Sequence, residues 1–264
     1  MNLFEAIVLG IIQGLTEFLP VSSSGHIEIG QAILNTDSLK EQEELLSVVL
    51  HAATALATIF VFRKDILEII KGLINPKDKA QKQFTMFIIL SMIPAALVGV
   101  FLDDILNQLF EGQLLLVSCM LLVTGALLMF TDKFEPKEKL DLTYGKALLI
   151  GIAQAVAILP GISRSGATIS TSLLLNVDRS TAARFSFLMV VPLILGKMAK
   201  DILDGKLQLT EELVMPFTAG FLAALISGVF ACRWMISIVK ESKLSYFAYY
   251  CWAVGLIGII YTLV

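Results

Sequence analysis

The sequence predicts an all-α integral membrane protein, with six transmembrane helices plus two re-entrant helical hairpins in an inverted-topology repeat. Three observations predict this fold: the composition, a duplicated motif and the distribution of basic residues among the loops. Hydrophobic residues make up 56% of the 264 residues, charged residues make up 16%, and the mean hydropathy is +0.81. These values are too apolar for a soluble domain of this length.

The duplicated motif begins near the N-terminus and recurs about 141 positions later. Each copy is an apolar stretch that is broken by Pro and followed by a run of Ser and Gly. In a membrane protein, interrupted segments at matching positions of two halves are the best sequence pointer to a binding site. The segments near 3–33 and 147–175 are therefore expected to enter the membrane and turn back. The recurring residues are Ala6, Gly10, Ile11, Gln13, Ser22, Ser24 and Gly25, matched by Ala147, Gly151, Ile152, Gln154, Ser163, Ser165 and Gly166.

Six other segments are continuous apolar runs. A transmembrane helix needs roughly 17–25 such residues to cross about 30 Å of hydrocarbon. The predicted spans are 46–62, 84–101, 113–131, 184–199, 213–232 and 246–263.

The loop charges give the orientation of these spans. If the hairpins do not cross the membrane, the loops 63–83, 132–146, 176–184 and 232–245 share one side and hold fifteen Lys and Arg, whereas 34–45, 102–112 and 200–212 hold three. Basic loops stay in the cytoplasm, so both termini are expected outside. Three spans separate the hairpins, and this odd number inverts the second copy. The predicted repeats are 1–135 and 136–264, within a single membrane domain.

Composition also excludes some functions. The net charge is −3 and the basic residues are confined to one face, so nucleic acid is not an expected partner. The three cysteines, Cys119, Cys232 and Cys251, are scattered among apolar spans without the spacing of a metal site, and we expect no disulfide.

The first motif places polar residues inside an apolar segment. Gln13 and Glu17 are four residues apart and share one helical face. A carboxylate at this depth is costly and is by default a candidate for function. After Pro20, hydroxyls, a glycine and an imidazole precede a new helix, whose free N–H groups suit a phosphate-like anion; these residues are Ser22, Ser23, Ser24, Gly25 and His26. The alternative is that the serines only cap this helix and that Glu17 pairs with a neighbour.

The second motif places Arg164 at the equivalent break. An arginine at membrane depth costs several kcal/mol unless it is paired, and its planar fork matches two phosphate oxygens. Alternatively, Arg164 forms a salt bridge to Glu17 when no ligand is bound, which would still place it in the same pocket. The surrounding polar and small residues are Gly161, Ser163, Ser165 and Thr168.

Together these motifs resemble those of the undecaprenyl-diphosphatase family, the bacterial membrane phosphatases linked to bacitracin resistance. The resemblance rests on Gln13 and Glu17, on Pro20 to His26 and on Pro160 to Thr168, and it extends over essentially the whole chain. It implies hydrolysis of a C55 polyprenyl diphosphate to the monophosphate and inorganic phosphate. It also implies Mg²⁺ or Ca²⁺ as cofactor, the bacterial inner (cytoplasmic) membrane as location, and an active site that opens to the outer face. Many members have Glu where this chain has Gln13, which leaves Glu17 as the one carboxylate of the motif.

Hydrolysis of a diphosphate needs neutralised oxygens, a positioned nucleophile and proton transfer. We expect Arg164 to clamp the phosphate and Ser23, or a water that it holds, to be the nucleophile. Glu17 would be the base or the metal ligand, and His26 would protonate the leaving group or orient the phosphate. His51 is either a supporting residue or a buried histidine without a role. The residues expected to bind substrate are Gln13, Ser22, Ser24, Gly25, Gly161, Ser163, Ser165 and Thr168.

Two other functions remain open at this point. Inverted repeats around a central site also suit a transporter that moves polyprenyl phosphate across the bilayer. An ion channel is less suited, because hydroxyls and an arginine favour an anion and carboxylates are sparse. The expected partners are the polyprenyl diphosphate lipid and the membrane bilayer; whether the chain forms a homodimer is left open.

Overall fold

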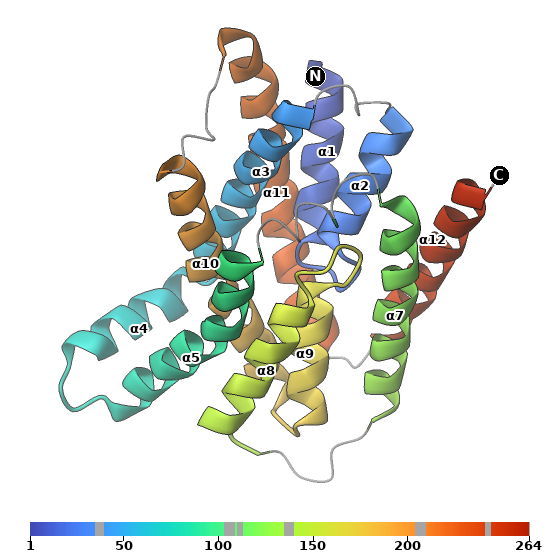
Figure 1. Cartoon of the computed structure of the whole chain (residues 1–264). Coiled ribbons are helices and arrows are strands. Elements are labelled where there is room, and N and C mark those ends of the chain that lie inside the picture. The colour runs from blue at the N-terminus through green and yellow to red at the C-terminus, as the bar shows by residue number, and fades with distance from the viewer. Residues whose placement is uncertain are drawn as a thin grey trace.

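The structure is a computed structural model that describes residues 1–34, 40–102, 109, 113–134, 140–203, 210–240 and 244–263. Within these residues the chain is helical, apart from turns and one isolated β-bridge between Leu140 and Val177. Figure 1 shows the helices as one elongated bundle. The all-α class predicted from the sequence is therefore confirmed.

Five of the described helices are long and apolar enough to cross a membrane. A sixth crossing is present if α3 (Lys40–Val61) and α4 (Arg63–Ile74) count as one span, which bends by 76° between them. The chain is thus a multi-pass membrane protein with five or six spanning helices among the described residues. The five helices are α5 (Lys79–Phe101), α7 (Leu114–Lys133), α10 (Arg179–Leu203), α11 (Glu211–Lys240) and α12 (Ser245–Leu263).

Two pairs of helices are too short to cross. They are α1 (Leu3–Thr16) with α2 (Ser23–Leu34), and α8 (Tyr144–Val156) with α9 (Arg164–Leu174). At 1.5 Å per residue these helices reach roughly 16–21 Å, which is less than the hydrocarbon thickness of about 30 Å. Figure 1 shows α1 and α2 in the upper half of the bundle and α8 and α9 in the lower half. The breaks of both pairs therefore lie near the middle.

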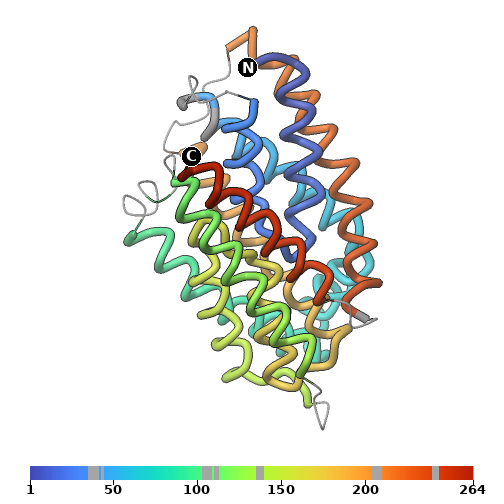
Figure 2. The backbone as a smooth tube through the Cα atoms, turned by 90° about the vertical axis from the view of Figure 1, so that its right-hand side faces the viewer, coloured from blue at the N-terminus to red at the C-terminus, as the bar shows by residue number. Residues whose placement is uncertain are grey.

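The two chain ends lie at the same end of the bundle. In Figures 1 and 2 both termini are at the top, whereas the α4–α5 connection and the start of α8 lie at the bottom. Lys77 belongs to that connection, Lys79 begins α5, and Lys146 lies in the first turn of α8. The described basic residues of these segments are thus far from the termini.

Glycines allow the short helices to pack closely on long ones. Helix α1 packs along α11, and α8 packs along α5. A Cβ atom at Gly10 would overlap the carbonyl oxygen of Gly220, and one at Gly151 would overlap that of Ser91. Small residues give membrane helices this close approach, which provides their van der Waals attraction. Gly10 and Gly151 occupy the same position of the duplicated motif, so both copies use one packing device.

Gly151→Ala should lower the free energy of unfolding by about 1–3 kcal/mol, because the added methyl has no room against the α5 backbone. The matched control on the same helix is Gly145→Ala, where a Cβ meets no atom within 4 Å. That variant should gain about 0.5–1 kcal/mol from the better helix propensity of alanine. Denaturation in mixed micelles measures both changes. Equal stability of the two variants would contradict the close α8–α5 contact.

Candidate active site

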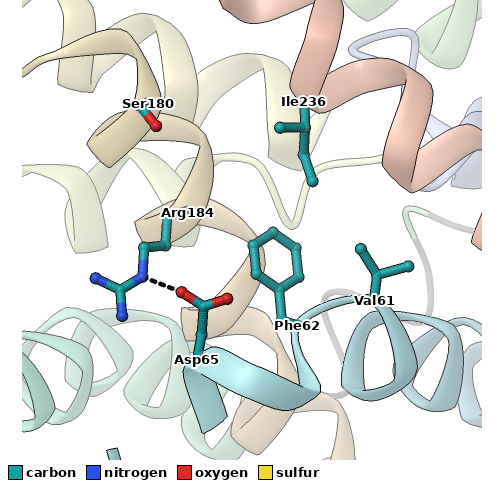
Figure 3. A pocket seen from close by; sticks show the side chains of 6 residues that line it. All are labelled: Val61, Phe62, Asp65, Ser180, Arg184 and Ile236. Carbon is teal, nitrogen blue, oxygen red and sulfur yellow. Dashed lines mark hydrogen bonds and ion pairs between the residues drawn. The ribbon is translucent and has the colours of Figure 1, made fainter. Parts of the chain in front are cut away.

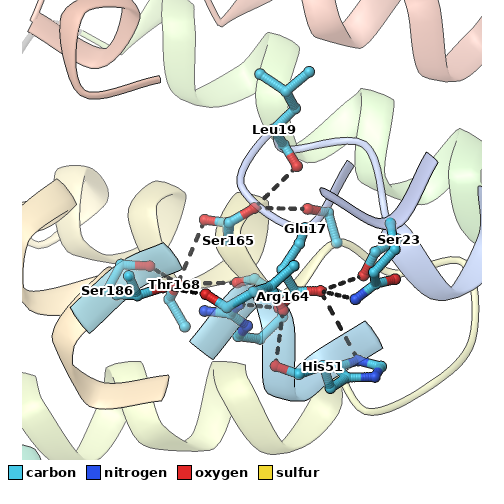
Figure 4. Close-up of polar contacts among 12 residues, drawn as sticks. Glu17, Leu19, Ser23, His51, Arg164, Ser165, Thr168 and Ser186 are labelled. Atoms are coloured by element: carbon cyan, nitrogen blue, oxygen red, sulfur yellow. Dashed lines mark hydrogen bonds and ion pairs between the residues drawn. The ribbon is translucent and has the colours of Figure 1, made fainter. Parts of the chain in front are cut away.

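The breaks of the two short helix pairs contact each other. The Ser165 hydroxyl donates to the backbone carbonyl of Leu19 at 3.1 Å, as Figure 4 shows. A Cβ at Gly25 would lie 3.3 Å from the Cα of Gly161, so the backbones approach within van der Waals distance. The segments around Leu19 and Ser165, 146 positions apart in the chain, therefore form one centre.

Backbone geometry ends the first helix of each pair. Pro20 and Pro160 lack an N–H group and cannot continue a helix. Each break then passes through the left-handed region, at Ser22 (φ +70°) and at Gly161 (φ +89°). A side chain at Gly161 would also overlap the Val117 carbonyl, so this position requires glycine.

The second helix of each pair begins with the same serine cap. The backbone N–H of Gly25 donates to Ser22 Oγ at 3.3 Å, and that of Gly166 donates to Ser163 Oγ at 3.0 Å. Such caps satisfy N–H groups that the first helical turn leaves free. The cap expected of the first motif's serines is thus present at Ser22, and Ser163 forms the same cap in the second motif; the expected part of both in substrate binding stays a prediction. In both copies the capping serine also contacts the serine two residues on, Ser24 at 3.3 Å and Ser165 at 3.2 Å.

The first residues of both new helices converge on Glu17. Ser23 Oγ donates to Glu17 Oε2 at 2.6 Å, and Arg164 Nη2 donates to Oε1 at 2.5 Å. The amide of Gln13, one turn earlier on α1, donates to Oε2 at 3.1 Å. The Glu17 side chain is only 7% exposed. The structure thus brings together Gln13, Glu17, Ser23 and Arg164, and the salt bridge anticipated from the sequence is present.

Arg164 is only partly used by these contacts. Its Nη1 atom is buried and has no hydrogen-bond partner among the described residues. A buried donor without a partner is rare and calls for an explanation. Because a guanidinium can bind two oxygens with its fork, one arm holds Glu17 and the other is available to an oxygen of an anion.

The two histidines of the chain have different surroundings. The rings of His26 and Tyr250 are stacked at 5.5 Å, and His26 Nε2 lies 2.8 Å from Tyr250 Oη. The other nitrogen of His26 lies 2.8 Å from the carbonyl oxygen of Ser22. No described contact joins His26 to Glu17, so its expected catalytic role stays a prediction.

His51 faces the carboxylate instead. Its Nε2 lies 3.9 Å from Glu17 Oε2, and its Nδ1 lies 2.7 Å from the Ser47 carbonyl oxygen. A proton on Nδ1 that bonds this carbonyl leaves Nε2 of the neutral ring as the proton acceptor. The contact with Glu17 is what a supporting role requires and the bond to Ser47 is what a satisfied histidine requires, so the role of His51 stays a prediction. No sequence pattern reports the distance between α3 and the first motif, so the two interpretations could not be separated at that stage.

Buried hydroxyls fix the second break. Thr124 of α7 accepts from the Ser163 N–H and donates to the Gly161 carbonyl, both at 3.1 Å. Thr168 donates to the Arg164 carbonyl at 2.9 Å and lies 2.5 Å from the hydroxyl of Ser186. Thr124 was not predicted, because a lone threonine in an apolar span carries no sequence signal. These bonds hold the backbone from which Arg164 projects.

The fold and the centre together define a class: a polytopic helical membrane protein in which two helix breaks bury an ion pair, and in which one nitrogen of the arginine has no partner among the described residues. A family model described as bacitracin resistance protein BacA matches residues 6–257. The chain belongs to this family.

Curated relatives match the chain over nearly its whole length. A protein of Christiangramia forsetii is 56% identical and covers 99% of this chain and 98% of its own. One of Parabacteroides distasonis is 45% identical (100% and 99%), and one of Halothermothrix orenii is 41% identical (98% and 98%). Each of these three relatives is named undecaprenyl-diphosphatase.

The ion pair predicts a measurable coupling. Glu17→Gln or Arg164→Gln alone leaves one buried charge without its partner, so each variant should lose about 3–5 kcal/mol of stability. The double variant should lose less than the sum of the two, because neither charge remains. A double-mutant cycle on the ligand-free protein, unfolded in mixed micelles, measures this coupling. Strictly additive losses would mean that the contact contributes nothing.

Proposed function

We propose that the protein is an enzyme that hydrolyses undecaprenyl diphosphate to undecaprenyl phosphate and inorganic phosphate, and so recycles the lipid carrier for cell-wall synthesis. The observation that carries this proposal is the centre itself. Arg164 and the Ser23 hydroxyl donate to the two oxygens of one carboxylate, Glu17, while Arg164 Nη1 keeps no partner among the described residues. The names of the relatives support the same substrate.

Substrate binding is proposed to use the free arm of Arg164. A phosphate oxygen occupies Nη1, and a second oxygen replaces Glu17 at Nη2, because the fork binds two oxygens of one phosphate. This exchange frees Glu17 Oε1 while Ser23 and Gln13 stay bonded to Oε2. The first turns of α2 and α9 both begin at this centre, and their positive ends favour the phosphate charge.

Proton transfer is proposed to run through the Ser23–Glu17 contact. At 2.6 Å the hydroxyl is within the reach that a general base requires. In one route Glu17 takes the proton of Ser23 as its oxygen attacks the terminal phosphorus, the bridging P–O bond breaks and undecaprenyl phosphate leaves; water then hydrolyses the phosphoserine to inorganic phosphate. In the other route Glu17 takes the proton of a water that Ser23 holds, and attack by this water breaks the same P–O bond and gives both products in one step. His51 lies 3.9 Å from the same carboxylate and is placed to pass a proton on. His26, held by Tyr250, is proposed to orient the phosphates.

A divalent cation fits the centre only if phosphate oxygens of the substrate supply part of its ligands. The described residues hold no group of three or more His, Cys, Asp or Glu side chains that could bind a metal. Mg²⁺ is commonly held by one or two carboxylates together with substrate phosphates. Glu17 and the amide oxygen of Gln13 would supply the protein ligands for Mg²⁺ or Ca²⁺. When bound, the cation neutralises charge on the phosphate oxygens.

The two short helix pairs are proposed to be re-entrant hairpins of an inverted repeat, with repeats 1–135 and 136–264. In support, Figure 1 places α1–α2 and α8–α9 in opposite halves of the bundle. Both pairs share the serine cap and the close-packing glycine, 141 positions apart (Ser22 and Ser163, Gly10 and Gly151). The proposed location is the bacterial inner membrane, with both termini and the opening of the site on the outer face.

Hydrolysis should depend on Glu17 far more than on Gln13. Glu17→Gln should slow phosphate release by about 10²–10⁴-fold, as expected for loss of a positioned base. The matched control is Gln13→Glu, one turn away on the same helical face, which should remain active because it adds a carboxylate at the same centre. Single-turnover release of phosphate from undecaprenyl diphosphate, with folding checked by detergent chromatography, measures both. If Glu17→Gln hydrolyses like the original protein, a polyprenyl phosphate transporter becomes the better proposal.

The orientation predicts which positions are reachable from outside. In a Cys119→Ala background, Gln113→Cys and Thr210→Cys should react with a membrane-impermeant maleimide on intact cells. Lys77→Cys should react only after the membrane is permeabilised, because it belongs to the basic face. Labelling of Lys77→Cys and Gln113→Cys from the same side would refute the topology.

A further inference from the structure

A cavity of about 250 Å³ lies away from the Glu17–Arg164 centre. It is bounded by the bend between α3 and α4, the first turns of α10 and the later part of α11, as Figure 3 shows. Three of the six lining side chains are apolar and the other three are polar. The lining residues are Val61, Phe62, Asp65, Ser180, Arg184 and Ile236.

Arg184 is the cation of this cavity. Its Nε donates to Asp65 Oδ1 at 2.6 Å, and its guanidinium carbon lies 4.8 Å from the ring centre of Phe84. The structure gives its two terminal nitrogens no hydrogen-bond partner among the described residues. Both side chains of the pair are 32% exposed, so a ligand can reach them. The guanidinium is thus oriented by Asp65 and Phe84 while its outer edge stays available.

Three further arginines lie on the helices that border the cavity: Arg63 on α4, Arg179 on α10 and Arg233 on α11. Arg63 and Arg233 lie 5.1 and 5.8 Å from the ring centre of Phe60, which precedes the lining residue Val61. Arg179 is adjacent to Ser180, and its Nη1 donates to the Val239 carbonyl at 3.4 Å. Among the described residues Asp65 is the one acidic residue that lines the cavity, and Asp178 lies next to Arg179 and accepts from the Ser180 N–H at 3.1 Å. This balance favours an anion.

Aromatic rings separate the cavity from the active site. Phe62, a lining residue, lies 6.0 Å from Phe187, which lies 5.8 Å from Phe18. Phe18 is the residue after Glu17, and all three rings are buried. A ligand of the cavity would therefore be held apart from the catalytic carboxylate by three packed side chains.

We propose that this cavity is a second binding site, for a phosphate group, at the end of the bundle opposite the chain termini. Arg184 would bind two phosphate oxygens through its free nitrogens, and the Ser180 hydroxyl would donate to a third. Val61, Phe62 and Ile236 would line a chain attached to the phosphate. Two sources share this chemistry: the phosphate of a membrane lipid, whose anionic head group is attracted by basic residues, and free inorganic phosphate.

The test uses the purified full-length protein and three probes: dioctanoyl phosphatidic acid, the neutral dioctanoylglycerol, and inorganic phosphate. Dissociation constants come from microscale thermophoresis. Arg184→Gln should weaken binding of phosphatidic acid about tenfold or more, as expected for loss of a charge-assisted hydrogen bond. Asp65→Asn should strengthen it severalfold, because it removes the acidic competitor. Ser180→Ala breaks no ion pair, and should weaken binding even if Arg184→Gln fails to fold.

Lys197→Gln is the matched control, since it breaks the Lys197–Asp201 ion pair (3.0 Å) farther along the same helix, α10. It should leave the affinity unchanged. Displacement of phosphatidic acid by millimolar inorganic phosphate would identify free phosphate as the ligand, and its failure to compete would identify a lipid. Equal binding of dioctanoylglycerol, or unchanged affinity in the Arg184, Asp65 and Ser180 variants, would overturn the proposal.

Discussion

The ion pair between Glu17 and Arg164 is the interaction on which the rest of the centre depends. Each charge alone would be costly at this depth, and together they offset most of that cost only if hydrogen bonds complete their environment. Ser23 and Gln13 supply those bonds to Glu17, while the Thr124 and Thr168 hydroxyls fix the backbone around Arg164. The breaks in both short helix pairs are needed for the same reason, because they bring the first turn of α2 and that of α9 to one carboxylate.

The duplicated motif keeps its scaffold and changes its chemistry. The capping serines, Ser22 and Ser163, perform the same function in both copies, and so do the packing glycines. At the charged positions the copies differ: the second copy has no carboxylate before Pro160 to match Glu17, and Arg164 stands where the first copy has Ser23. Two identical copies would bring two like charges together, which is unfavourable in an apolar site. The divergence of the copies instead places one negative charge (Glu17) beside one positive charge (Arg164), so the net charge of the centre is close to zero.

Local signals made most of this arrangement predictable. Spans follow from continuous hydrophobicity, and the Ser23–Glu17 contact joins residues only six apart. The Glu17–Arg164 pair could be anticipated because so few charges lie inside the membrane. The sequence could not place His51 or Thr124, because α3 and α7 reach the centre through helix packing. Nor could it foresee that His26 stacks on Tyr250, more than 200 residues away, instead of facing Glu17 (His26 to Tyr250). Such long-range contacts have no local pattern.

Under the proposed function, the same ion pair links substrate binding to activation of the nucleophile. A phosphate that takes over both arms of Arg164 removes the counter-ion of Glu17, and a carboxylate without a counter-ion in an apolar site gains most from taking up a proton. The nearest proton is that of Ser23, already directed at Oε2. In the absence of substrate, Arg164 keeps the carboxylate ionised and the hydroxyl intact, so the centre is inert toward water. The pairing that stabilises the empty protein is therefore also what makes its reactivity conditional on a bound phosphate.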